Sequence, residues 1–206
     1  MASPLDQSFF QVRFDWGVDG LRRLADSDVV IVVDVIGFGF EALAAGERGE
    51  SLALGDAADG GAAVARAAAA AEHGPVVYAG GFRNAAAVAQ AVMAEQGRRG
   101  VRTSIAVIAA GEPDGPGLRF AVEDLLGAGA VIAALSDLGI DHSSPEAVAT
   151  AESFRALRRA VKHLLTASGS GRQLDGHPRL AEVKAAAVID DLDAVPVLQD
   201  GVFTAS

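Results

Sequence analysis

Residues 104–135, SIAVIAAGEPDGPGLRFAVEDLLGAGAVIAAL, decide how the rest of the chain is interpreted. The apolar run of residues 105–110 has the length of a buried strand. Residues 111–117 hold three glycines and two prolines, which predicts a loop rather than a helix. Apolar residues then recur at helical spacing, at Leu118, Val122, Leu125, Leu126 and Ile132. A strand, a glycine-rich loop and a helix in this order bring backbone N–H groups and ionisable side chains to one edge of a sheet.

Two further parts of the chain repeat this order. Residues 29–33, VVIVV, form a β-branched run that predicts a strand buried on both faces, and Asp34 follows directly. Residues 75–79 predict another buried strand, which leads through a glycine turn at residues 80–84 into a helix over residues 85–93. This alternation predicts an α/β fold: a single domain over residues 1–206, with a mainly parallel or mixed sheet flanked by helices.

The remaining elements follow from local patterns of the same kind. We expect strands over residues 9–16 and 51–54, helices over residues 17–25, 57–72 and 180–188, a helix that starts at residues 41–45 after the segment 37–40, and a loop over residues 166–176. Ser144 is predicted to cap a helix that has Pro145 at its first position and continues through Phe154, Leu157, Val161 and Leu164. Residues 195–198 and 202–203 predict a closing hairpin.

The composition limits the classes of partner. Seventeen Lys and Arg against 27 Asp and Glu give a formal net charge of −10, so we expect no nucleic-acid binding, which depends on basic contacts to phosphates. No apolar segment reaches the roughly 20 residues that span a bilayer, and no signal-like segment begins the chain, so we expect no membrane insertion and a cytoplasmic location. The absence of cysteine excludes disulfides and thiol nucleophiles. The Ala-rich helix faces are compatible with a homodimer.

The residues best suited to chemistry are carboxylates and arginines near the predicted strand ends. None of the four histidines falls into a metal-spaced pair, and the sequence lacks a GxSxG elbow and a P-loop lysine. Carboxylates supply the hard oxygen ligands that suit Mg²⁺, and guanidinium groups neutralise phosphate oxygens. The candidates are Asp34, Glu112, Glu123 and Asp124 on one side and Arg83 and Arg119 on the other. Together they predict a site for a small phosphorylated or carboxylated anion.

Each of these residues also has a purely structural interpretation. Asp34 could cap the helix that follows it, and Arg119 could pair with Glu123 one turn further on. Arg83 and Asn84 stand at a predicted helix start, where an anion would meet a guanidinium and free N–H groups. The two glycines before them are by themselves a weak signal for a phosphate loop and favour a simple tight turn. The residues alone leave both interpretations open.

Several segments, in the same order along the chain, resemble the 2-phosphosulfolactate phosphatase family, the ComB-like proteins. They are residues 29–35 (VVIVVDV), 82–88 (FRNAAAV), 104–132, 170–174 (SGRQL) and 193–201 (DAVPVLQDG), and the most specific is GLRFAVEDLLGAGAVI within residues 104–132. The resemblance implies a ComB-like α/β fold and a Mg²⁺-dependent phosphatase. The implied reaction removes phosphate from 2-phospho-3-sulfolactate, so the expected ligand is a small phosphorylated or sulfonated anion.

The resemblance also suggests roles for individual residues. We expect catalytic roles for Asp34, Glu123 and Arg119, and a magnesium ion held by Asp34, Glu123 and Asp124. We expect substrate binding by Arg83, Asn84, Glu112 and Arg172. Neither a metal-bound water nor a carboxylate is favoured as the nucleophile.

Two alternatives to this phosphatase hypothesis stay open. The segment 37–40, GFGF, stands where the family usually has Arg, Ser and Thr, which favours a catalytically degenerate member that acts as a binding or assembly protein. Phe38 and Phe40 would then cover the former pocket or a partner. A weaker alternative is another small-molecule enzyme on the same fold.

Overall fold

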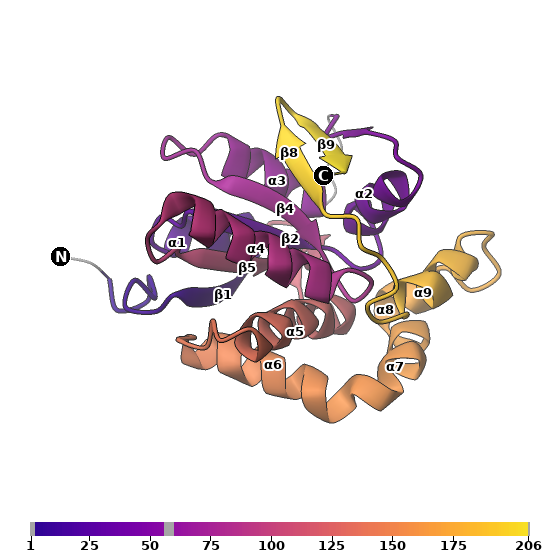
Figure 1. Cartoon of the computed structure of the whole chain (residues 1–206). Helices are drawn as coiled ribbons and strands as arrows, with labels where there is room; N and C mark the ends of the chain where they lie inside the picture. The colour runs from indigo at the N-terminus through magenta and orange to yellow at the C-terminus, as the bar shows by residue number, and fades with distance from the viewer. Residues whose placement is uncertain (1–2, 56–59, 206) are drawn as a thin grey trace.

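The computed structural model describes residues 3–55 and 60–205, in which a mixed seven-stranded sheet lies between two groups of helices (Figure 1). The strands are β1 (Val12–Trp16), β2 (Val29–Val33), β3 (Leu52–Ala53), β4 (Val76–Gly80), β5 (Ile105–Ala109), β8 (Pro196–Gln199) and β9 (Val202–Ala205). Their order in the sheet is β1-β5-β2-β4-β8-β9-β3. The first four strands run parallel, and the last three join them by antiparallel pairing. The predicted α/β class with a mixed sheet is therefore confirmed.

Strands β2 and β5 are the two inner strands of the parallel part of the sheet, and every residue of both is buried. Their β-branched and small side chains pack against helices on both faces, as expected for parallel strands covered on each side. Val29, Ile31 and Val33 belong to one hydrophobic core, whereas Val30 and Val32 belong to a second core on the opposite face. The continuous apolar run therefore reflects a strand with two cores.

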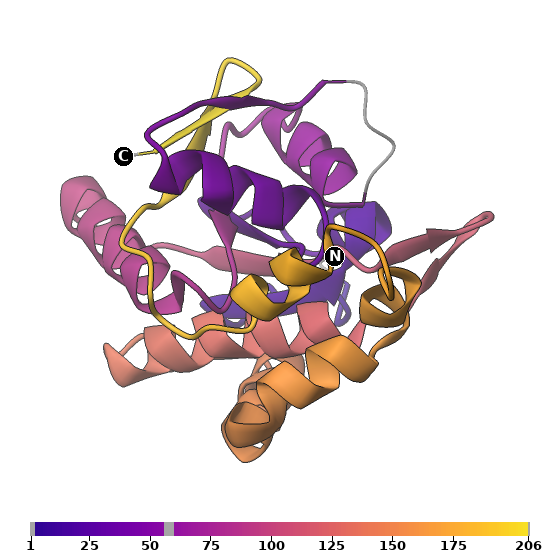
Figure 2. The same cartoon turned by 90° about the vertical axis from the view of Figure 1, so that its right-hand side faces the viewer.

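Helices cover both faces of this sheet (Figures 1 and 2). Helices α1 (Gly17–Arg23), α2 (Phe38–Glu47) and α3 (Gly60–Ala69) supply the core around Val30 and Val32. Helices α4 (Ala85–Arg99) and α5 (Val122–Asp137) cover the other face, and α6 (Pro145–Leu157) packs on α5. A 3-10 turn (Arg158–Ala160) leads into α7 (Val161–Ala167), and α8 (Gly169–Gln173) and α9 (Leu180–Ala186) follow.

The small residues of α5 explain how one helix fits between the sheet and α6. A Cβ atom on Gly127 would lie 2.5 Å from Cγ2 of Val35 at the end of β2. A Cβ atom on Gly129 would lie 2.4 Å from the carbonyl oxygen of Thr150 in α6. Side chains at these two positions would push the helix away from both neighbours, because protein interiors are close-packed. The glycine- and alanine-rich sequence of α5 is thus a packing requirement.

The structure corrects the prediction for residues 111–117. This segment is not an open loop, because it contributes to a projecting hairpin of β6 (Glu112–Asp114) and β7 (Gly117–Arg119), seen at the right of Figure 2. Proline is tolerated here because a two-stranded ribbon consists of edge strands only. Gly115 supplies the positive φ of the turn, at +56°. Leu118 consequently lies in β7 rather than in the following helix, which begins at Val122.

Other boundaries differ in smaller ways. The predicted loop at residues 166–176 contains the end of α7 and all of α8. Helix α2 begins at Phe38, which is buried against Phe203 of β9 with ring centroids 5.9 Å apart. The first strand begins at Val12, and the ring of Phe9 is 79% exposed. Residues 57–59 of the expected helix over residues 57–72 lie outside the described part of the chain.

Two local predictions are confirmed in detail. Ser144 caps α6, since its Oγ accepts a hydrogen bond from the N–H of Ala147 at 3.1 Å. Strands β8 and β9 form the predicted hairpin. Asp200 and Gly201 of its turn have φ values of +51° and +78°, as a tight two-residue turn requires. Among the described residues, no helix has the length and apolar character needed to cross a membrane.

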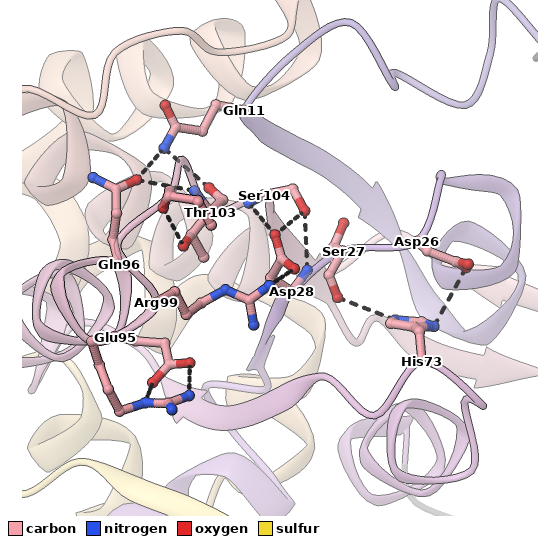
Figure 3. Close-up of polar contacts among 12 residues, drawn as sticks. Gln11, Asp26, Ser27, Asp28, His73, Glu95, Gln96, Arg99, Thr103 and Ser104 are labelled. Carbon is pink, nitrogen blue, oxygen red and sulfur yellow. Dashed lines mark hydrogen bonds and ion pairs between the residues drawn. The ribbon is translucent and has the colours of Figure 1, made fainter.

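A polar network joins the amino ends of the strands, opposite the edge at which ligands bind in sheets of this type (Figure 3). The carboxylate of Asp28 accepts hydrogen bonds from the N–H and the Oγ–H of Ser104, each at 2.8 Å, and forms an ion pair with Arg99. The side-chain oxygen of Gln96 accepts hydrogen bonds from Gln11 at 2.8 Å and from the N–H of Thr103 at 3.1 Å. These contacts fix the start of β5 against its neighbours.

Candidate active site at the carboxyl edge of the sheet

Asp34 follows β2 at the carboxyl edge of the sheet and is buried. Its Oδ2 accepts a hydrogen bond from the N–H of Gly61, in the first turn of α3, at 3.2 Å. The carboxylate therefore faces α2 and α3, whereas the next side chain, Val35, belongs to the core on the other face. The alternation of side chains along an extended strand explains this division.

Three glycines enclose Asp34. A Cβ atom on Gly61 would lie 2.4 Å from Oδ2 of Asp34, and one on Gly37 would lie 2.6 Å from Oδ1. A Cβ atom on Gly39 would meet the backbone oxygen of Asp34 at 2.2 Å. No larger residue fits at these positions without movement of Asp34. The glycines of the segment 37–40 thus make room for the carboxylate.

Asp124 in the first turn of α5 joins the ends of β2 and β5 to that helix. Its Oδ1 accepts a hydrogen bond from the N–H of Val35 at 2.8 Å, and its Oδ2 accepts one from the N–H of Gly111 at 2.9 Å. Burial raises the pKa of Asp124 to about 8, and the charges of Glu123 and Glu112 act in the same direction. The two backbone N–H groups oppose this rise, because they favour the ionised form.

A second cluster, which we call the hairpin cluster, consists of Glu112, Arg119 and Ser170. Nε of Arg119 donates to Oε2 of Glu112 at 2.9 Å, and Nη2 of Arg119 donates to Oγ of Ser170 at 3.2 Å. The Ser170 hydroxyl donates to Oε1 of Glu112. The hydrogen bond to Glu112 raises the pKa of Arg119, and the negative charge of buried Glu123 adds to this effect. The cluster joins the β6–β7 hairpin to α8 next to the start of α5.

Arg83 and Asn84 lie at the end of β4, and their polar groups have protein partners. Arg83 donates four hydrogen bonds of 2.8–3.1 Å to the carboxylates of Glu47 and Asp191. These carboxylates raise the pKa of Arg83, so the group is a fixed cation. Asn84 is fully buried; its Oδ1 accepts a hydrogen bond from Gly81, and its Nδ2 donates to the carbonyls of Ala79 and Ala194. The contacts of both residues join the loop after β4 to distant segments.

Arg172 lies on the outer side of α8. Its side chain is 71% exposed, and its guanidinium lies 3.7 Å from the carboxylate of Asp175. Ser170, two residues earlier, is buried against the hairpin, and residues two apart on a helix do not share a face. The predicted binding residues are thus divided: Glu112 and Arg119 lie in the hairpin cluster, whereas Arg172 points away from Ser170.

The structure does not group the predicted metal ligands into one cluster. Within residues 3–55 and 60–205, no three histidine, aspartate or glutamate side chains lie close enough together to hold a metal ion. The charge near α5 nevertheless suits a divalent cation, since the carboxylates of Glu112, Glu123 and Asp114 all act on the guanidinium of Arg119. Mg²⁺ commonly keeps several waters and takes only one or two carboxylates together with a substrate phosphate.

The cavity beside Asp34 is small. It measures about 10 Å³, space for roughly one water, and is lined by Asp34, Arg83 and the apolar side chains of Phe40, Leu43, Phe82 and Ala186. Larger hollows lie elsewhere. One of about 410 Å³ lies between α1 and α3 near the amino ends of the strands, and one of about 430 Å³ lies between α1, the start of α3 and the β6–β7 hairpin. The second has the size of a small-molecule site and borders the β6–β7 hairpin.

Sequence reasoning missed several residues that hold this region together. Glu47 and Asp191 bind Arg83 but lie 36 and 108 residues from it, so no local pattern connects them. Ser170 stood in a segment that we expected to be a loop, and its contact with Glu112 spans 58 residues. The glycines around Asp34 were visible in the sequence, but glycine alone does not reveal which atom it makes room for.

A protein-family model matches the part of the chain that contains most of these residues. The family model described as 2-phosphosulpholactate phosphatase matches residues 58–201. This range contains Arg83, the hairpin cluster and the start of α5, whereas Asp34 precedes it. No curated protein matches the chain. Since the matched residues make up more than half of the sequence, the chain belongs to the 2-phosphosulpholactate phosphatase family.

Proposed function

We propose that the protein hydrolyses a small phosphoric monoester of the 2-phosphosulfolactate type to the hydroxy acid and phosphate. The observation that carries this proposal is the position of Arg119 within the matched residues: it lies beside the buried acidic start of α5 at the carboxyl edge of the sheet. In open α/β sheets ligands bind outside this edge. A guanidinium beside carboxylates can hold phosphate oxygens while an adjacent acidic group handles a proton.

The residues divide into three roles in this proposal. Arg119 donates hydrogen bonds to the phosphate and stabilises the charge that develops on its oxygens. Glu123 and Asp34 are the proposed catalytic carboxylates, and Glu112 fixes Arg119 from its Nε side. Water adds its oxygen to phosphorus, the ester P–O bond breaks, and the leaving alkoxide takes up a proton to become the hydroxyl of the product. Arg83 and Asn84, whose polar groups have protein partners, hold the loop after β4, and Arg172 stays a candidate for contact with the rest of the substrate.

Magnesium is the cofactor that we propose, with Asp34, Glu123 and Asp124 as candidate ligands. The negative charges of Glu112, Glu123 and Asp114 around Arg119 support a cation near the start of α5. Both oxygens of Asp124 already accept backbone hydrogen bonds, so its main contribution is to hold the ends of β2 and β5 at the site. When bound, the ion would neutralise phosphate oxygens and lower the pKa of a water ligand.

The second candidate function is that of a binding protein without catalysis. The observation that favours it is the small size of the cavity at Asp34, about 10 Å³. The apolar side chains of Phe40, Leu43 and Phe82 line this cavity. A cavity of this size holds no phosphorylated acid. The two functions differ in turnover, since only the first releases phosphate.

The test is release of phosphate from 2-phospho-3-sulfolactate, with and without Mg²⁺. We expect turnover with Mg²⁺ and a loss of about 100-fold in kcat for Arg119→Ala. Arg155→Ala is the matched control, because its guanidinium is 38% exposed and paired with Glu152 and Asp137, against 40% for Arg119. Absence of turnover across a panel of small phosphoesters would exclude the phosphatase function and favour the binding protein.

A further inference from the structure

We propose that Ser170 is a positioning residue that orients the guanidinium of Arg119 toward a phosphate group. This inference rests on the proposed function, in which Arg119 binds the phosphate. Ser170 lies in α8, is only 6% exposed and faces the β6–β7 hairpin across 51 residues of sequence. It is thus a buried hydroxyl supplied to the hairpin cluster by a different element.

The hydrogen bonds of Ser170 define its role. Its Oγ accepts a hydrogen bond from Nη2 of Arg119 at 3.2 Å, and its proton is donated to Oε1 of Glu112. Glu112 in turn accepts from Nε of Arg119 through its other oxygen. Glu112 also forms an ion pair with Nη2 of Arg119. The hydroxyl of Ser170 therefore closes a network of three side chains, in which it gives Nη2 a second acceptor and holds the Glu112 carboxylate that contacts both Nε and Nη2.

Gly169 provides the space for this arrangement. A Cβ atom at Gly169 would lie 2.8 Å from Nη1 of Arg119 and 3.2 Å from Cζ. The guanidinium consequently lies directly against the first residue of α8, with Ser170 next to it. Gly169 leaves space for the guanidinium and Ser170 supplies a hydrogen-bond acceptor, so the start of α8 is complementary to the guanidinium of Arg119.

The network leaves one edge of Arg119 for a ligand. Nη1 has a contact of 3.5 Å with the carbonyl oxygen of Phe120, which is too long for a strong hydrogen bond. The Arg119 side chain is 40% exposed, and its side-chain partners Glu112 and Ser170 contact Nε and Nη2. The oxygens of a phosphate monoester are the acceptors that match this exposed guanidinium edge.

Ser168 offers a matched control two residues earlier. Its Oγ accepts a hydrogen bond from the N–H of Gly171 at 3.1 Å and donates to the carbonyl of Leu165 at 2.9 Å. It is buried to the same extent as Ser170 and stabilises α8, but its hydrogen bonds reach neither Glu112 nor Arg119. Ser168→Ala therefore reports what loss of a buried hydroxyl does to α8 alone.

The experiment measures binding of inorganic phosphate by titration calorimetry, together with KM for the phosphoester. We expect Ser170→Ala to weaken phosphate binding and raise KM by roughly five- to tenfold, the net value of one ordinary hydrogen bond. Ser170→Thr keeps the hydroxyl and should restore most of the affinity. Gly169→Ala, at an exposed helical position, should weaken binding similarly because its methyl group displaces Nη1. Ser168→Ala should leave the phosphate affinity of the folded protein unchanged.

Each outcome separates this inference from the proposed function. If Ser170→Ala binds phosphate as the wild type does, or if Ser168→Ala and Ser170→Ala weaken binding equally, the positioning role is overturned although phosphatase activity stands. If the wild type binds phosphate with the predicted dependence on Ser170 but releases none from esters, the proposed hydrolysis fails and the positioning role stands. A wild type that binds no phosphate overturns the positioning role as well.

Discussion

Asp28 is a carboxylate whose folded environment opposes its protonation. Burial alone would raise the pKa of Asp28, but the hydrogen bonds from Ser104 and the charge of Arg99 outweigh it, so this pKa lies below its ordinary value (Figure 3). A group with a depressed pKa in the folded protein stabilises the fold above its unfolded pKa, which is about 3.9. That contribution disappears as the pH falls through the folded pKa.

We therefore expect Asp28→Asn to lower the free energy of unfolding at pH 7 by about 1.5–3 kcal/mol, the usual range for hydrogen bonds to a charged group. The difference from the wild type should shrink once the pH falls below about 4. Urea unfolding at several pH values measures this difference in the free energy of unfolding. Asp26→Asn is the control, because this carboxylate is 84% exposed and should change stability by less than about 0.5 kcal/mol. A pH-independent loss for Asp28→Asn would contradict the electrostatic explanation.

Residue types alone identified the ionisable groups at the carboxyl edge but not their partners. Asp34, Glu123 and Asp124 were predicted there from strand ends, and all three are buried at that edge. Their partners depend on which distant backbone N–H groups the fold brings to them, such as Gly61 for Asp34. Such contacts form only when helices dock, and hydrophobic periodicity predicts the face that a helix buries but not which backbone N–H group meets which carboxylate.

At the scale of elements, glycines decide how closely helices approach the site. Gly61, in the first turn of α3, lies against Asp34, where a Cβ atom would lie 2.4 Å from Oδ2. We expect Gly61→Ala to destabilise the fold by about 1–3 kcal/mol through this overlap. Gly97, near the end of α4, has no atom within 4 Å of its Cβ position, so Gly97→Ala should stabilise the fold by about 0.5–1 kcal/mol.

Equilibrium unfolding of both alanine variants tests this contrast, because the chemical change is the same and only the surroundings differ. Stabilisation by Gly61→Ala would show that α3 can move away from Asp34. Phosphate release by Gly61→Ala adds a second readout, since displacement of a proposed catalytic carboxylate by even 1 Å is costly for positioning.

Element types were predictable where one signal dominated and unpredictable where signals competed. The β-branched run of β2 and the Ser144–Pro145 start of α6 each carry an unambiguous local signal, and both were predicted correctly. In residues 111–117 the glycines and prolines favoured a loop, while the antiparallel pairing of Glu112 with Arg119 produced a ribbon. The pairing adds side-chain contacts between strands that composition does not reveal.

At the scale of the whole molecule, the parallel half of the sheet was predictable and the antiparallel half only in part. Alternation of strands and helices predicts β2, β4 and β5 as neighbours under helices. The closing hairpin was also predicted, but its place beside β4, with β3 beyond it, depends on long-range contacts. The segment that leads to this hairpin is held partly by Arg83, whose partner Asp191 lies shortly before β8.

Arg83 is therefore expected to stabilise the assembly of three distant segments. Its guanidinium is 8% exposed and joins the end of α2 at Glu47 and the segment before β8 at Asp191 to the loop after β4. Arg83→Met keeps most of the apolar stem but leaves both carboxylates without their cation. We expect a loss of about 2–3 kcal/mol in the free energy of unfolding, below the cost of breaking a fully buried pair because Glu47 and Asp191 are 49% and 35% exposed.

Arg83→Lys separates charge from geometry, because lysine keeps the positive charge but lacks the planar fork that serves two carboxylates at once. It should recover only part of the loss. Arg48→Met is the control, since its ion pair with Glu50 lies at the surface and should contribute less than about 1 kcal/mol. Urea unfolding of the three variants decides the point: if Arg83→Met is as mild as Arg48→Met, the three segments are held together by apolar packing alone.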